Sequence, residues 1–221
     1  MSLHVNPESA AIKQRFALTL EYLKQSDLAK MMIEELEASG RRIEVYISRA
    51  GDDRYSPPST DQGGGTVHWN YTKTLRTAKE VANRPHKVPS HGAAAPLNAP
   101  PTHLTRPGII WGRREAASME GYMSPALALM HELGHAYQWL TMRDVERVPH
   151  AEADSRWGGA PDAAARVVME NLNVNAVENT VAMELRAKGF VEGIRWHYAD
   201  HVGKTEDTEE TFPGYLSKVS E

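Results

Sequence analysis

The segment SPALALMHELGHAYQWL, residues 124–140, places two histidines and a glutamate inside an otherwise apolar helical pattern. Ser124 is a typical helix N-cap residue, and Pro125 suits the first helical turn. In a helix that begins there, His131 and His135 are four residues apart and lie one above the other on one face. Burying these polar groups is unfavourable unless a ligand satisfies them. The segment therefore predicts a packed helix that binds a metal ion.

The spacing of the His-Glu-Leu-Gly-His motif indicates zinc chemistry. Neutral imidazoles four residues apart can bind one Zn²⁺ and leave positions open for a third ligand and a water. Glu132 follows the first histidine, where it can accept a proton from water whose pKa the ion has lowered to about 7. Gly134 removes bulk at a place where we expect another backbone to come close. We interpret the motif as that of a zinc hydrolase, with Glu132 as the general base.

The composition limits the alternatives. The chain has 221 residues, 41% of them hydrophobic, which suits one globular domain. A net charge of −4 gives no indication of nucleic acid or an anionic membrane as the main partner. No apolar run is long enough to predict a membrane span, and the N-terminal residues lack the apolar core of a signal peptide. The absence of cysteine excludes disulfides, thiolate nucleophiles and cysteine-ligated zinc.

Hydrophobic periodicity and turn residues predict the main elements. Gly40 and Gly189 are suitable helix ends. A strand-rich first half followed by helices favours an α+β domain. The predicted elements are a helix-rich segment over 8–39, strands over 41–49 and 66–72, a loop over 50–65, an irregular proline-rich segment over 85–107 and a helical run over 161–188.

The third metal ligand is not fixed by the motif itself. A site of the H-E-x-x-H-x-x-G-x-x-H type is excluded, because Gln138 and Thr141 occupy the positions that need glycine and histidine. His150, Glu152 and Asp154 lie in a loop-like segment, where solvated charges are the more ordinary interpretation.

Two glutamates of the second helical run are better candidates. Glu170 and Glu178 both stand among apolar residues, whereas Glu184 falls near the expected exposed end of the run. Eight residues span about 12 Å along a continuous helix, so only one of the two can bind the metal directly. The other would orient a ligand residue by contacting it on the side away from the metal. Spacing alone leaves the choice between Glu170 and Glu178 open.

Three sequence elements together carry a family resemblance: HELGHA at 131–136, MENLNVNAVENTVAMELRAKG at 169–189 and RWHY at 195–198. This set resembles the NleD-like and clostridial-neurotoxin-like zinc endopeptidases. With the chain size and the lack of cysteine, it is most similar to the HopH/XopG type III secreted effectors of plant-pathogenic bacteria. The resemblance covers roughly residues 124–200. Asn171 departs from it, because many relatives carry a second acid at that position.

The resemblance implies roles for four residues. Glu170 would be the third zinc ligand, and Glu178 would orient a ligand or Arg195. Arg195 and Tyr198 would stabilise the oxyanion of peptide hydrolysis. A guanidinium and a phenol suit that task, since they can stabilise charge that develops only in the transition state.

The resemblance also implies a fold and a biological setting. It predicts an α+β, zincin-like metalloprotease with a small N-terminal sheet and a motif helix packed against a glutamate-bearing C-terminal helix. We expect a disordered leader over 1–8, one catalytic domain over 9–203 and a polar tail over 204–221. The implied cofactor is Zn²⁺, the substrate a host protein, the route type III secretion without a cleaved signal, and a further partner a secretion chaperone. Three alternatives remain: an aminopeptidase, an amidase, or a non-enzymatic interaction module with structural zinc.

Overall fold

The computed structural model describes residues 2–6, 9–60, 62–77, 121–141, 170, 173–190, 192–194, 201–207 and 211. These residues form a mixed α+β arrangement with small sheets and a few helices, as the sequence predicts. In chain order the elements are β1 (Leu3–Asn6), α1 (Ala10–Leu23), α2 (Asp27–Ala38), β2 (Ile43–Ser48), β3 (Arg54–Ser56), β4 (Thr66–Asn70), β5 (Lys73–Thr77), β6 (Gly121–Met123), α5 (Pro125–Thr141), η1 (Val174–Glu178), α8 (Asn179–Ala187) and β7 (His201–Asp207).

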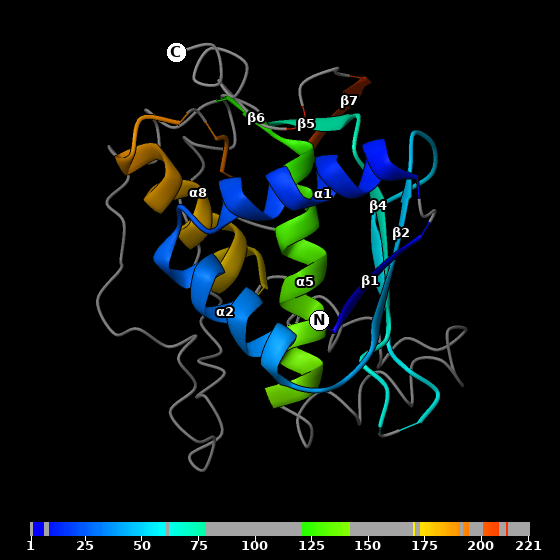
Figure 1. The fold of residues 1–221 in the computed structure, drawn as a ribbon. Coiled ribbons are helices and arrows are strands. Elements are labelled where there is room, and N and C mark those ends of the chain that lie inside the picture. Colours follow the sequence, from blue (N-terminus) through cyan, green and yellow to red (C-terminus); the bar gives the residue numbers. More distant parts are fainter. Residues whose placement is uncertain are drawn as a thin grey trace, which may run out of the picture.

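Helix α5 is the centre of this part of the molecule. Every residue from Pro125 to Trp139 is buried, as expected of a helix that is packed on all sides. It contacts β3, β4 and β6 as well as α1, α2 and η1. Figure 1 shows α5 between the sheet that contains β1, β2 and β4 on one side and helices α2 and α8 on the other. The predicted helix over 124–140 is confirmed, and its polar motif lies in the protein interior.

The larger sheet has the strand order β1-β2-β4-β3. Strands β1, β2 and β4 are parallel, and β3 pairs antiparallel to β4 at the edge. Val45 of β2 pairs with Val67 of β4, and Ile47 pairs with Trp69. All four side chains are buried, whereas Tyr46 between them is 46% exposed. This alternation confirms the two predicted strands and shows which face of the sheet packs on the core.

The N-terminal helices pack against α5 and begin at serine caps. The Ser9 side chain accepts a hydrogen bond from the Ile12 N–H, and Ser26 accepts one from the Ala29 N–H. Glu184 of α8 strengthens the second cap, because it accepts hydrogen bonds from the Ser26 hydroxyl and the Leu28 N–H. Glu184, which the sequence places near an exposed helix end, is therefore half-buried and hydrogen-bonded.

Two expected irregular segments contain strands. Residues 3–6 of the predicted leader form β1, which pairs with β2 and buries Leu3. The predicted loop over 50–65 contains the three-residue strand β3. Both strands are too short to produce a clear local pattern, and each is stabilised by pairing with a longer strand: β1 with β2, about 40 residues away, and β3 with β4, the next strand in the chain. The disordered-leader prediction is therefore wrong for these residues.

The predicted polar tail also contributes to the fold. Its first residues, 204–207, belong to β7, which pairs antiparallel to β5 in a second sheet of order β6-β5-β7. Thr211 is buried, and its backbone carbonyl accepts a hydrogen bond from the Ala126 N–H at the start of α5. The boundary predicted at residue 203 therefore falls inside β7, and these residues are hydrogen-bonded to the folded domain.

Candidate metal centre

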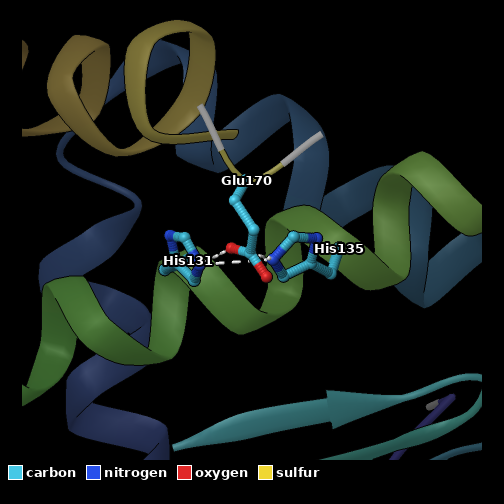
Figure 2. Close-up of side chains that lie close together, drawn as sticks. All are labelled: His131, His135 and Glu170. Atoms are coloured by element: carbon cyan, nitrogen blue, oxygen red, sulfur yellow. Dashed lines mark hydrogen bonds and ion pairs between the residues drawn. The ribbon is translucent and has the colours of Figure 1, made fainter. Parts of the chain in front are cut away.

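Three side chains from two distant segments converge on one point. His131 and His135 project from α5, and their Nε2 atoms are 3.2 Å apart. The Glu170 Oε2 atom lies 3.2 Å from the first of these nitrogens and 3.1 Å from the second. Figure 2 shows the two imidazoles and the carboxylate pointing toward one another. These three residues form a buried group that could hold a metal ion.

The spacing of the three atoms fits a tetrahedral metal site. With ligand bonds of about 2.0–2.1 Å, the corners of a tetrahedron are about 3.3 Å apart. The three observed separations, 3.1–3.2 Å, come within a few tenths of an ångström of that value. A point equidistant from all three atoms is therefore at bonding distance, with one corner of the tetrahedron left for another ligand.

Hydrogen bonds at the opposite ring nitrogens fix both imidazole tautomers. His131 Nδ1 lies 2.9 Å from Glu178 Oε2, and His135 Nδ1 lies 3.1 Å from Gln138 Oε1. A carboxylate oxygen and an amide oxygen accept hydrogen bonds, so both Nδ1 atoms must donate. In its neutral form, each ring would then carry a lone pair on Nε2 and direct it at the centre.

In the tautomers with protonated Nδ1, the three atoms that meet are all acceptors, and a proton or a metal ion between them would offset their repulsion. A proton can satisfy only one pair of atoms, whereas a metal ion satisfies all three at once. Burial alone lowers the pKa of His131, but hydrogen bonds with Glu170 and Glu178 and the charge of Glu132 outweigh it and raise that pKa to about 9. Burial likewise raises the pKa of Glu170, but the two histidines outweigh it and hold the pKa well below its usual range. Protons and metal ions thus compete for this centre.

Strand β3 packs against α5 beside the motif, near Glu132 and His135. Glu132 is 7% exposed and follows the first histidine. Tyr55 of β3 stacks against His135, with ring centroids 6.5 Å apart and an angle of 18° between the rings. Asp53 precedes this strand, two residues from Tyr55, and its pKa is raised to about 7 by burial and by the charge of Glu132, against a hydrogen bond from the Asn70 N–H. Strand β3 therefore runs beside the motif.

Both candidate glutamates reach His131, at different nitrogens. Glu170 lies at Nε2 and Glu178 at Nδ1. Glu178 is the last residue of η1, a π-helical turn, so the rise of a continuous α-helix does not apply to the whole segment that ends there. Such turns insert into α-helices and are frequent at functional sites. In this arrangement Glu170 belongs to the ligand group, and Glu178, which is fully buried, orients His131 from behind.

The remaining predicted residues divide into two groups. The Ser124 N-cap is confirmed, because its Oγ accepts a hydrogen bond from the Leu127 N–H at 3.2 Å. Gly189, with φ of +90°, ends α8 as predicted. The other candidates, together with the proline-rich segment and the start of the second helical run, lie outside the described residues: His150, Glu152, Asp154, Arg195 and Tyr198.

Sequence reasoning missed Gln138 and Asn173, two buried polar residues at the centre. Gln138 is 1% exposed and orients His135. Asn173 is fully buried, and its Nδ2 donates to the backbone carbonyl of His131 at 2.8 Å. The available signal was an amide inside an otherwise apolar helical pattern. The group packed against Gly134 is the side chain of Asn173, so the expected close approach of a backbone is wrong.

A second buried acid, Glu192, had no recognisable signal in the sequence. Its carboxylate accepts hydrogen bonds from the Tyr22 hydroxyl at 2.5 Å and from the hydroxyl and N–H of Ser124 at 2.7 and 3.0 Å. Burial raises the pKa of Glu192 to about 7, against these hydrogen bonds, and the charge of Glu178 adds to the rise. We call Glu192, Tyr22 and Ser124 the Glu192 cluster. It anchors the first turn of α5, ahead of the metal centre.

Comparison with known proteins identifies no relative: no family model matches the chain, and no curated protein or solved structure matches it either. Among the described helices, none has the length and apolar character needed to cross a membrane. Function must therefore be argued from the geometry of the centre and from the sequence motif.

Proposed function

We propose that this protein is a zinc-dependent endopeptidase of the zincin class. The observation that carries the proposal is the triangle of His131 Nε2, His135 Nε2 and Glu170 Oε2, with both imidazole lone pairs directed at its centre. Nitrogen and oxygen donors in a tetrahedral arrangement with an open corner suit catalytic Zn²⁺. The resemblance of the HELGHA, MEN…VEN and RWHY elements to zinc endopeptidases supports the same proposal.

In the proposed reaction, zinc supplies Lewis-acid chemistry, lowering the pKa of water and polarising the peptide carbonyl. Glu132 removes a proton from the attacking water and then delivers it to the nitrogen of the leaving amine. Glu178 and Gln138 keep the two imidazoles in the tautomer that leaves Nε2 unprotonated. Arg195 and Tyr198 stabilise the oxyanion, a role that comes from the resemblance.

The resemblance also supplies the biological part of the proposal. We propose that the substrate is a host-cell protein and that the chain reaches it by type III secretion, with a secretion chaperone as partner.

The experiment that tests the proposal compares the wild-type chain with Glu132→Gln. Both proteins, loaded with zinc, are incubated with an extract of plant cells, and new peptide termini are mapped by mass spectrometry. Wild type should create termini inside host proteins, and the Gln variant should create them at least about 100-fold more slowly, since it lacks the base. Metal analysis of both proteins is the control, because the substitution leaves all three ligand atoms in place.

Three results would contradict the proposal. Equal cleavage by the two proteins would show that Glu132 is not the base. Trimming confined to the ends of proteins would indicate an exopeptidase. A wild-type chain that holds zinc but creates no new termini, while it binds one host protein as well as the Gln variant does, would indicate an interaction module.

A further inference from the structure

The side chain of Asn173 joins the two segments that supply the metal ligands. It lies three residues after Glu170 and is fully buried. Its Nδ2 atom donates a hydrogen bond of 2.8 Å to the backbone carbonyl of His131. Within the described residues, its Oδ1 atom has no hydrogen-bonding partner. The amide is therefore bonded to α5 only through its Nδ2 atom, at the backbone of the ligand residue His131.

The Oδ1 atom faces Gly134, the residue before the second histidine ligand. A Cβ atom on residue 134 would lie 2.2 Å from Oδ1, and also 3.1 Å from Cγ and 3.3 Å from Nδ2 of Asn173. The whole amide group, and not only its tip, thus occupies the space that a larger side chain would need. Rotating the amide would not relieve the clash, and it would break the bond to His131. Because Gly134 has no side chain, it leaves the space on α5 that the Asn173 amide occupies.

These contacts join Asn173, three residues after Glu170, to α5 beside both histidine ligands. The hydrogen bond reaches one ligand residue, His131, and the close contact reaches the neighbour of the other, His135. A shift of Asn173 would therefore move Glu170 relative to both imidazoles. Metal affinity depends on the orientation of the ligands, and loss of a group that orients them commonly weakens binding. A buried amide at this position thus controls a geometry to which metal affinity is sensitive.

We infer that Asn173 is a positioning residue of the metal centre and that Gly134 is its complementary partner on α5. Asn173 holds the Glu170 segment at the separation from α5 that brings the carboxylate within reach of the same ion as the two histidines. The inference rests on the metal binding of the proposed function. It adds Asn173, which is neither in the His-Glu-Leu-Gly-His motif nor among the three ligands, as a residue that controls metal affinity.

The test is a double-mutant cycle with Asn173→Ala, Gly134→Ala and the double variant. Zinc dissociation constants are measured by competition with a chromophoric chelator, and thermal unfolding is measured on the metal-free proteins. Asn173→Ala should weaken zinc binding about 10- to 100-fold, as loss of groups that orient ligands commonly does. Gly134→Ala should weaken it at least as much, because the new methyl group displaces the amide.

The double variant should bind zinc no more weakly than Asn173→Ala alone, since the methyl group then fills the space that the amide has left. Asn70→Ala is the matched control. Asn70 is also a buried amide that donates to a backbone carbonyl, that of Gly51, at 3.1 Å. This control should lower the unfolding temperature and leave the zinc dissociation constant unchanged.

Two results would overturn the inference. One is wild-type zinc affinity in Asn173→Ala together with a lowered unfolding temperature, which would indicate a purely structural contact. The other is additive losses in the double variant, which would show that Gly134 and Asn173 act independently. If Asn173→Ala does not fold, Asn173→Ser takes its place in the same cycle. A wild-type chain that binds no zinc would instead contradict the proposed function itself.

Discussion

Two carboxylates, Glu170 and Glu192, contact the same helix, α5, or its N-cap Ser124. Their pKa values are nevertheless shifted in opposite directions. Burial raises the pKa of both. For Glu170 the two histidines outweigh burial and hold the pKa far below its ordinary value. For Glu192 the donors are hydroxyl and N–H groups of Tyr22 and Ser124, which carry no charge, and the pKa rises to about 7.

The difference shows that the charge of the partners, rather than burial, determines what each acid can do. The Glu192 cluster can bury a proton and remain neutral, because its hydrogen bonds are satisfied without a cation. The metal centre contains three acceptors in contact and a further acid, Glu178, behind one of them. This concentration of acceptors favours positive charge, from protons or a metal ion, at its middle. One carboxylate is thus suited to anchoring a helix and the other to binding an ion.

The largest expected effect that distinguishes Glu192 from Glu170 is a pH dependence of the free energy of unfolding, caused by the raised pKa of Glu192. Its folded-state pKa of about 7 exceeds the ordinary value of 4.5, so the folded chain keeps a proton that the unfolded chain loses between these pH values. The free energy of unfolding should therefore fall as pH rises from about 4.5 to about 7, by about 3 kcal/mol from this group. Glu192→Gln removes the titration and with it this contribution.

Urea unfolding of the two metal-free proteins at pH 5 and pH 8 measures the effect. The stability of wild type relative to Glu192→Gln should decrease by roughly 2–3 kcal/mol between these pH values, because the unfolded chain has already lost part of this proton at pH 5. Other titrating groups are common to both proteins and cancel in the difference. Parallel pH profiles would mean that Glu192 is ionised at both pH values, and the contrast with Glu170 would be lost.

A smaller effect is expected from Glu178→Gln at the metal centre. The substitution keeps the shape of the side chain but removes the charge that makes His131 a stronger ligand. Zinc binding should weaken about 10- to 100-fold, measured by competition with a chelator. Glu184→Gln is the matched control on α8, because Glu184 caps α2 through Ser26 and Leu28 and lies outside the ligand group.

The two variants should therefore separate affinity from stability. Glu184→Gln should lower the unfolding temperature and leave zinc affinity unchanged. Equal losses of zinc affinity in Glu178→Gln and Glu184→Gln would show that any acid on this helix has the same influence. The assignment of Glu178 as the residue that orients His131 would then be incorrect.

The motif helix and the paired strands were predictable from sequence, because their signals are local. The apolar flanks and Ser124 define α5, and strict alternation defines β2 and β4. Strands β1 and β3 were missed, since a strand of three or four residues depends on its partner rather than on its own pattern.

The candidate site was predictable only in part, for a related reason. Spacing could not choose between Glu170 and Glu178, because both stand among apolar residues and both reach His131, at different ring nitrogens. Gln138 and Asn173 orient ligands through single hydrogen bonds, which no residue pattern reveals. Glu192 comes near Ser124 only through tertiary packing, 68 residues apart in sequence.

Metal binding itself tests the account most directly. The purified chain, stripped with a chelator, is titrated with Zn²⁺ and analysed by native mass spectrometry, beside a variant that carries both His131→Ala and His135→Ala. The account predicts one ion per wild-type chain and none in the variant at the same zinc concentration. A wild-type chain that stays metal-free, or a variant that binds zinc equally well, would contradict it.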